Sequence, residues 1–127
     1  MSFTTYLANK LLDHAFRNTA YAQPATVYIA LYTAAPSDAG GGTEVAGNGY
    51  ARVAVAFSAA SAKAIASSGI IAVGPCVTAN WGLITHGGVF DALTGGNLMT
   101  WAAITNRTIE VGDSYQFAAA DIDVLLT

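Results

Sequence analysis

Residues 26–57 read TVYIALYTAAPSDAGGGTEVAGNGYARVAVAF, and this stretch determines the expected fold. Apolar residues recur with a period of two at both of its ends, which indicates β-strands. Residues 26–32 are apolar on both faces, so they predict a strand inside a sheet. Residues 52–57 predict a second strand. The connection between the two strands contains five glycines and is long for neighbouring strands, so it calls for a physical explanation.

Short apolar runs separated by turn residues continue to the C-terminus. A DALTGGN turn and a Gly112-Asp113 turn divide them. This spacing is typical of an antiparallel β-sandwich or jelly roll. We therefore predict a mainly β domain spanning residues 1–127, with its sandwich over residues 26–127. The further expected strands are residues 70–73, 77–81, 83–90, 98–104, 108–111, 115–118 and 122–126.

The first twenty residues follow a helical period instead. Apolar side chains recur at steps of three to four residues, which predicts one amphipathic N-terminal helix. Ser2 is the expected N-cap, and the helix is expected to end near Asn18. We predict that Leu7, Leu11 and Phe16 pack this helix on the sheet.

Charge is sparse along the chain. Charged residues make up 10% of the sequence, against about 25% in a typical soluble domain, and the net charge is −3. A surface with so little charge favours burial in an assembly. The basic residues are scattered, which argues against nucleic-acid binding. Residues 64–90 carry no formal charge, but glycines interrupt them, so a membrane-spanning helix is not expected. The N-terminus also lacks the pattern of a signal peptide.

The glycine-rich connection does not match a nucleotide-binding loop. A phosphate loop needs a lysine after its glycines, whereas Glu44 stands here. Asp38 and Glu44 could contribute to a Ca²⁺ site, as could Asp121 and Asp123, but such a site needs six or more oxygens. We therefore predict no metal and no cofactor, and we interpret the glycines as a source of positive φ angles.

Candidates for catalysis are weak. Cys76 and His86 could form a nucleophile–base pair, but no motif surrounds the cysteine, and a buried inert thiol is the more common case. Aromatic residues could instead form a sugar-binding platform, although core or interface packing is the commoner use of such side chains. The candidates for that platform are Tyr28, Tyr32, Trp81 and Trp101. We predict a chain that is not an enzyme and has no small-molecule substrate.

Several stretches resemble a family of small structural proteins of tailed bacteriophages, often labelled tail fibre proteins. They are ALYTAAP and GGGTEV within residues 4–52, FDALTGGNL within residues 81–101, the later Gly-Asp turn and AAADIDVLL. The resemblance implies a virion protein, assembled in the bacterial host cytoplasm, that binds copies of itself and phage coat or tail proteins.

The chain has no heptads or repeats of the kind found in fibre shafts. We therefore predict a capsid decoration or cement protein that stabilises the head shell. The alternative is a small tail, baseplate or tail-fibre component, and a more remote one is a polysaccharide-degrading enzyme.

An assembly role would explain the long glycine-rich connection. We predict that it reaches across a subunit boundary, with Val45 and Tyr50 as apolar anchors and Glu44 paired to a basic group of a neighbour. If the connection is merely solvated, the sheet faces around Trp81 and Trp101 are the expected interface instead.

Overall fold

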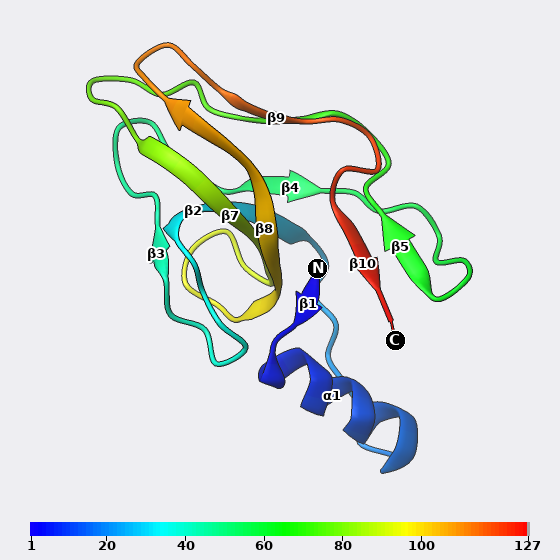
Figure 1. Cartoon of the computed structure of the whole chain (residues 1–127). Helices are drawn as coiled ribbons and strands as arrows, with labels where there is room; N and C mark the ends of the chain where they lie inside the picture. The colour runs from blue at the N-terminus through cyan, green and yellow to red at the C-terminus, as the bar shows by residue number, and fades with distance from the viewer. Residues whose placement is uncertain (127) are drawn as a thin grey trace.

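A computed structural model describes residues 1–126 of the chain. Over these residues the elements follow the chain as one short strand, one helix and then a series of strands (Figure 1). Their bounds are β1 Ser2–Phe3, α1 Thr5–Phe16, β2 Val27–Ala34, β3 Thr43–Glu44, β4 Val53–Val55, β5 Ala64–Ala66, β6 Ile71–Val73, β7 Gly82–Phe90, β8 Leu98–Ile109, β9 Tyr115–Phe117 and β10 Asp123–Leu125.

The main sheet contains six strands in the order β1-β8-β7-β2-β3, and β4 pairs with the start of β2. All of its pairings are antiparallel. Residues 91–97 connect β7 to β8 in a hairpin, as the DALTGGN sequence predicted. β2 lies between β7 on one side and β3 and β4 on the other, so the prediction of an interior strand is confirmed.

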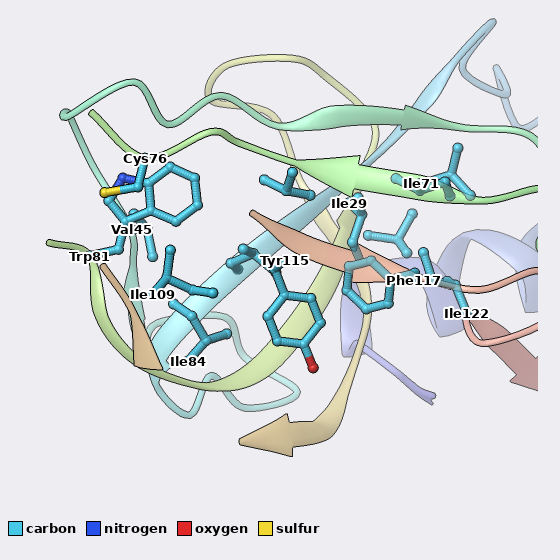
Figure 2. Close-up of a cluster of buried hydrophobic side chains, with 14 residues drawn as sticks. Ile29, Val45, Ile71, Cys76, Trp81, Ile84, Ile109, Tyr115, Phe117 and Ile122 are labelled. Carbon is cyan, nitrogen blue, oxygen red and sulfur yellow. The ribbon is translucent and has the colours of Figure 1, made fainter. Parts of the chain in front are cut away.

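One face of the main sheet carries the hydrophobic core. Ile29, Leu31 and Ile84 point into it and are fully buried. A separate ribbon of β6 and β9 contributes side chains from the opposite direction, including Tyr115 and Phe117, whose rings lie 4.9 Å apart. Figure 2 shows these aliphatic and aromatic side chains meeting between the strands. The mainly antiparallel β fold with one N-terminal helix is confirmed, and its two layers fit the predicted sandwich.

The helix begins at Thr5, and its N-cap is Thr4. The amide of Leu7 donates to Thr4 Oγ1 at 3.4 Å, and this hydroxyl donates to the carbonyl of Leu98 at 2.6 Å. The prediction of Ser2 as the N-cap is therefore wrong, because Ser2 belongs to β1 and pairs with Trp101 of β8. Thr4 is 2% exposed, so one side chain both caps the helix and joins it to β8.

Packing of the helix was predicted correctly for Leu7 and wrongly for Phe16. Leu7 is buried and Leu11 half-buried, whereas Phe16 is 82% exposed. Nine residues, or two and a half helical turns, separate Leu7 from Phe16, so the two side chains lie on opposite sides of the helix. In Figure 1, α1 extends from the end of the sheet next to β1. The helix ends at Phe16 with Arg17 as its C-cap, near the expected Asn18.

The strand predictions failed in the middle of the chain. Residues 77–81 do not form a strand, because Thr78 has a positive φ of 72° and the Val77 amide donates to the carbonyl of Asn48. The two strands expected over residues 98–104 and 108–111 are one long strand, β8. β1, β3 and β5 were not predicted, since two or three residues carry too little periodicity.

Candidate binding surface

The face of the main sheet that points away from the core is aromatic. Tyr28 pairs with Phe90 and Tyr32 pairs with His86, while Trp101 lies on the next strand opposite Gly88. Tyr32 and Phe90 are buried, and the other aromatic rings are half-buried. We call Tyr28, Tyr32, His86, Phe90 and Trp101 the aromatic outer face.

A glycine in β7 allows this face to close. A Cβ atom at Gly88 would lie 2.6 Å from Leu98 Cδ1 and 3.3 Å from Tyr32 Cε1. A Cβ atom essentially never lies 2.6 Å from a neighbour, so a larger residue would displace the end of the Leu98 side chain and crowd the Tyr32 ring. Gly88 therefore lets Tyr32 and Leu98 pack across the centre of the sheet.

The glycine-rich segment, defined as residues 33–52, folds back onto this sheet. Its strand β3 pairs with β2, and the amide of Val45 donates to the carbonyl of Leu31 at 3.0 Å. Farther along the segment, the carbonyl of Asp38 accepts from the amide of Thr5 at 2.9 Å. The Asp38 carboxylate accepts from Trp101 Nε1, also at 2.9 Å. The segment is thus attached to β2, to the start of α1 and to β8.

Arg52 is the centre of a polar network at the edge of the aromatic outer face. Its Nε and Nη2 donate to the two carboxylate oxygens of Glu44, each at 2.8 Å. Its Nη1 donates to the carbonyls of Ala92 at 2.9 Å and Gly95 at 2.7 Å. The guanidinium also lies 3.5 Å from the centre of the Phe90 ring, in cation–π distance. One side chain therefore joins the glycine-rich segment to the turn between β7 and β8.

Tyr50 extends this network into the core. Its hydroxyl donates to Glu44 Oε2 at 2.7 Å and accepts from the amide of Leu31 at 3.1 Å. Its ring meets Trp81 edge to face, with centroids 5.5 Å apart. Burial, followed by the bond to Glu44, raises the pKa of Tyr50. Burial, together with the nearby Glu44 carboxylate, raises the pKa of Tyr32 to about 12. Both phenols therefore keep their protons to a higher pH than an exposed tyrosine does.

A hollow of about 560 Å³ lies between the glycine-rich segment, the start of α1 and the turn before β8. Tyr32, Phe90 and Leu98 form apolar parts of its lining, while Asp38 and Asn97 add polar groups.

The predicted interface residues do not form one surface within the chain. Val45 and Trp81 are each 7% exposed and belong to the core, where Figure 2 shows them. Glu44 and Tyr50 belong to the Arg52 network, and Trp101 belongs to the aromatic outer face. An interface role for these five residues stays a prediction. Of the aromatic residues considered as a platform, three share the outer face, whereas Trp81 lies in the core.

The reactive groups considered from the sequence are separated or already bonded. Cys76 is buried in the core, and its thiol donates to the carbonyl of Ala79 at 3.0 Å. His86 lies on the opposite face of the sheet, with its ring 6.2 Å from Trp101. The Asp121 carboxylate accepts from the amide of Ala118. Over residues 1–126, no group of three or more His, Cys, Asp or Glu side chains is arranged to hold a metal ion.

A protein-family model described as podophage GP4 fiber I protein gp80 matches residues 2–125. The chain belongs to this family. The match confirms the resemblance to small structural proteins of tailed phages. Because the family description specifies a fibre protein, it supports the tail-fibre alternative better than head decoration. No curated protein matches the chain.

The helix that the structure describes within residues 1–126 is too short to cross a membrane.

Proposed function

We propose that this chain is a non-enzymatic structural subunit of a phage tail-fibre apparatus. The observation that carries the proposal is the family match, which covers residues 2–125 and therefore nearly the whole chain. Head decoration has no comparable support in that family description. The chain would act by contacting neighbouring tail or fibre proteins and further copies of itself.

The arrangement of the outer face supports a contact role. Tyr28, His86 and Trp101 expose parts of aromatic rings, and aromatic side chains are enriched in protein interfaces. Tyr32 and Phe90 lie beside them on the same face and are buried, and Arg52 stacks on Phe90 at its edge. Arg52 and Glu44 at this edge are already paired with each other, so covering them would not leave either of these two charges unpaired.

Copy number in the virion tests the fibre assignment. Quantitative mass spectrometry of purified virions, normalised to a head protein and a tail protein, would count this chain directly. A fibre subunit is expected at roughly 3 to 18 copies, as ring symmetries of oligomers allow. Hundreds of copies would contradict the proposal and support head decoration.

A variant pair tests the contact role of the aromatic outer face. Phage lacking this gene would be complemented with Tyr28→Ser, or with Ile70→Ser as a control that removes an exposed apolar side chain outside the main sheet, next to β6. The proposal expects at least about tenfold less incorporation of Tyr28→Ser, which corresponds to about 1.4 kcal/mol. Equal incorporation of both variants would exclude this face as the contact surface.

The non-enzymatic part of the proposal needs its own test. Purified protein would be incubated with surface polysaccharide from the host, and newly formed reducing ends would be measured. We expect no release above a heat-denatured sample. Release that persists in repurified protein would support the polysaccharide-degrading alternative.

A further inference from the structure

The N-terminal helix has a broad apolar arc, and the body of the chain covers only part of it. Leu7 is buried and Leu11 half-buried against the sheet, whereas Leu12 is 56% and Phe16 82% exposed. Phe16 follows Leu12 by four residues, so these two side chains are neighbours on one outward stripe. A phenylalanine exposed to this degree is a candidate anchor for a contact with another molecule.

An apolar groove lies on the other side of the same helix. It has a volume of about 350 Å³ and is enclosed by α1, the chain that follows α1, and the β5–β10 ribbon. None of the residues that line it is charged. Its lining includes Leu7, Leu11, Tyr21, Pro24, Phe57 and Ile65.

Phe16 cannot fill the groove of its own chain. Leu7 and Phe16 are nine residues apart in one unbroken helix, and nine residues correspond to two and a half turns. The Phe16 ring therefore points away from the groove that Leu7 lines. Any Phe16 side chain that enters such a groove must belong to another copy.

We propose that copies of this chain associate by inserting Phe16 of one copy into the apolar groove of another. The two surfaces match in chemistry, since an aromatic ring meets a groove with no charged lining residue. The charges nearest to Phe16 neutralise each other, because Arg17 Nη1 lies 3.2 Å from Asp13 Oδ1 and both side chains are exposed. Association therefore buries apolar surface without desolvating an unpaired charge. The low overall charge of the chain agrees with such a contact.

This surface is distinct from the aromatic outer face, so the inference does not rest on the proposed tail-fibre function. Copy number in the virion tests the fibre role, whereas self-association of the purified chain tests this contact. One result can fail while the other holds.

Sedimentation of the full-length chain over a concentration series provides the first test. Phe16→Ser removes the anchor, and Leu93→Ser removes an exposed leucine from the turn before β8 as a control. We expect Phe16→Ser to weaken association at least about tenfold and Leu93→Ser to leave it unchanged, with circular dichroism confirming that both fold. A wild-type chain that stays monomeric, or a Phe16→Ser chain that associates like the wild type, overturns the proposal.

Crosslinking from position 16 tests the groove itself. Phe16 would be replaced by the photoreactive benzoylphenylalanine, which keeps an aromatic ring, and isotope-labelled copies would separate contacts between chains from contacts within one chain. The proposal expects intermolecular crosslinks to peptides that contain Tyr21, Phe57 or Ile65. Crosslinks from one position 16 to another, or to peptides outside the groove, overturn the assignment of the groove as the acceptor.

A mixing experiment then checks that Phe16 and the apolar groove are the two separate halves of the contact. Ile65→Trp fills the groove and keeps Phe16, whereas Phe16→Ser keeps the groove. Each variant alone is expected to be monomeric, and an equimolar mixture is expected to form mixed dimers. If the folded Ile65→Trp variant associates like the wild type, the groove is not the acceptor. If no mixed dimers form, the donor–acceptor arrangement is excluded.

Discussion

The glycine-rich segment and the N-terminal helix are fixed to the sheet in opposite ways. The segment has little regular structure, yet Arg52 and Asp38 bind it to three other parts of the chain through side-chain and backbone contacts. The helix is regular along its whole length, yet one stripe of it packs while Phe16 on the other side is exposed. Regular secondary structure and attachment to the body are therefore separate properties in this molecule.

The difference follows from where each element finds its partners. The glycine-rich segment contains a charged pair, and the backbone carbonyls of the turn before β8 supply further acceptors for Arg52. The helix satisfies its own backbone internally and uses one side for packing, so nothing in the chain requires contact with the opposite side.

Arg52→Ala should strongly destabilise the attachment of the glycine-rich segment. It removes both bonds to Glu44, both bonds to the turn carbonyls and the stacking on Phe90. The Arg52 side chain is 8% exposed and that of Glu44 24%, so the carboxylate would be left partly buried without its partner. We expect a loss of about 3 kcal/mol in urea unfolding.

The matched control for this change is Arg17→Ala in the helix. It removes an ion pair whose side chains are 73% and 39% exposed, so we expect a loss below about 0.5 kcal/mol. Equal losses of unfolding free energy in the two arginine variants would show that the segment and the helix do not differ in this way.

Leucine substitutions should distinguish the two sides of the helix. Leu7→Ala removes a buried side chain beside the apolar groove, and we expect it to cost about 2 kcal/mol in urea unfolding. Leu12→Ala changes a residue that is 56% exposed on the outward stripe, and we expect it to cost less than about 0.5 kcal/mol. These unfolding measurements belong at a protein concentration where the chain is monomeric. A Leu12→Ala loss as large as that of Leu7→Ala would show that the outward stripe is packed within one chain.

Alkaline pH should destabilise the main sheet, because its buried tyrosines lose their protons. Burial raises the pKa of Tyr32 from 10.0 to about 12, so the folded chain keeps the phenolic proton to a higher pH than the unfolded chain does. The stabilisation is therefore complete below pH 10 and is lost as the pH rises from 10 toward 12. We expect the melting temperature to fall across this range.

Tyr32→Phe isolates the contribution of that tyrosine. The melting temperature of the variant should fall less steeply between pH 10 and 12. Some decrease should remain, because burial also raises the pKa of Tyr50. A slope that is identical in the wild type and in Tyr32→Phe would contradict the assignment.

Sequence periodicity was sufficient for the long elements. β2, β7 and the helix each contain enough alternating or three-to-four-residue repeats to define them. The same reasoning could not place Phe16, because helical amphipathicity does not say which part of a broad apolar arc is covered. It also split β8, because polar residues interrupt its alternation where the strand leaves the core.

The candidate surface was predicted less well, because it depends on contacts far apart in the sequence. Arg52 reaches carbonyls about forty residues away, and Asp38 meets Trp101 across sixty-three positions. Glu44 and Arg52 carry opposite charges and are only eight residues apart, so this pair was the one local sequence signal for the network. The family resemblance fared better, since it rested on motifs along much of the chain and the family match confirmed it.

Hydrogen exchange measured by NMR on individual amides tests directly whether the glycine-rich segment is closed onto the sheet or is a free arm. Three amide bonds join the segment to the rest of the chain: the amide of Val45 donates to the carbonyl of Leu31, that of Thr5 to the carbonyl of Asp38, and that of Val77 to the carbonyl of Asn48. We predict that these three amides exchange at least about a hundredfold more slowly than in an unstructured peptide, a local opening free energy of about 2.7 kcal/mol. Exchange of all three at unstructured rates, while the amides of β2 stay protected, would show that the segment is a free arm.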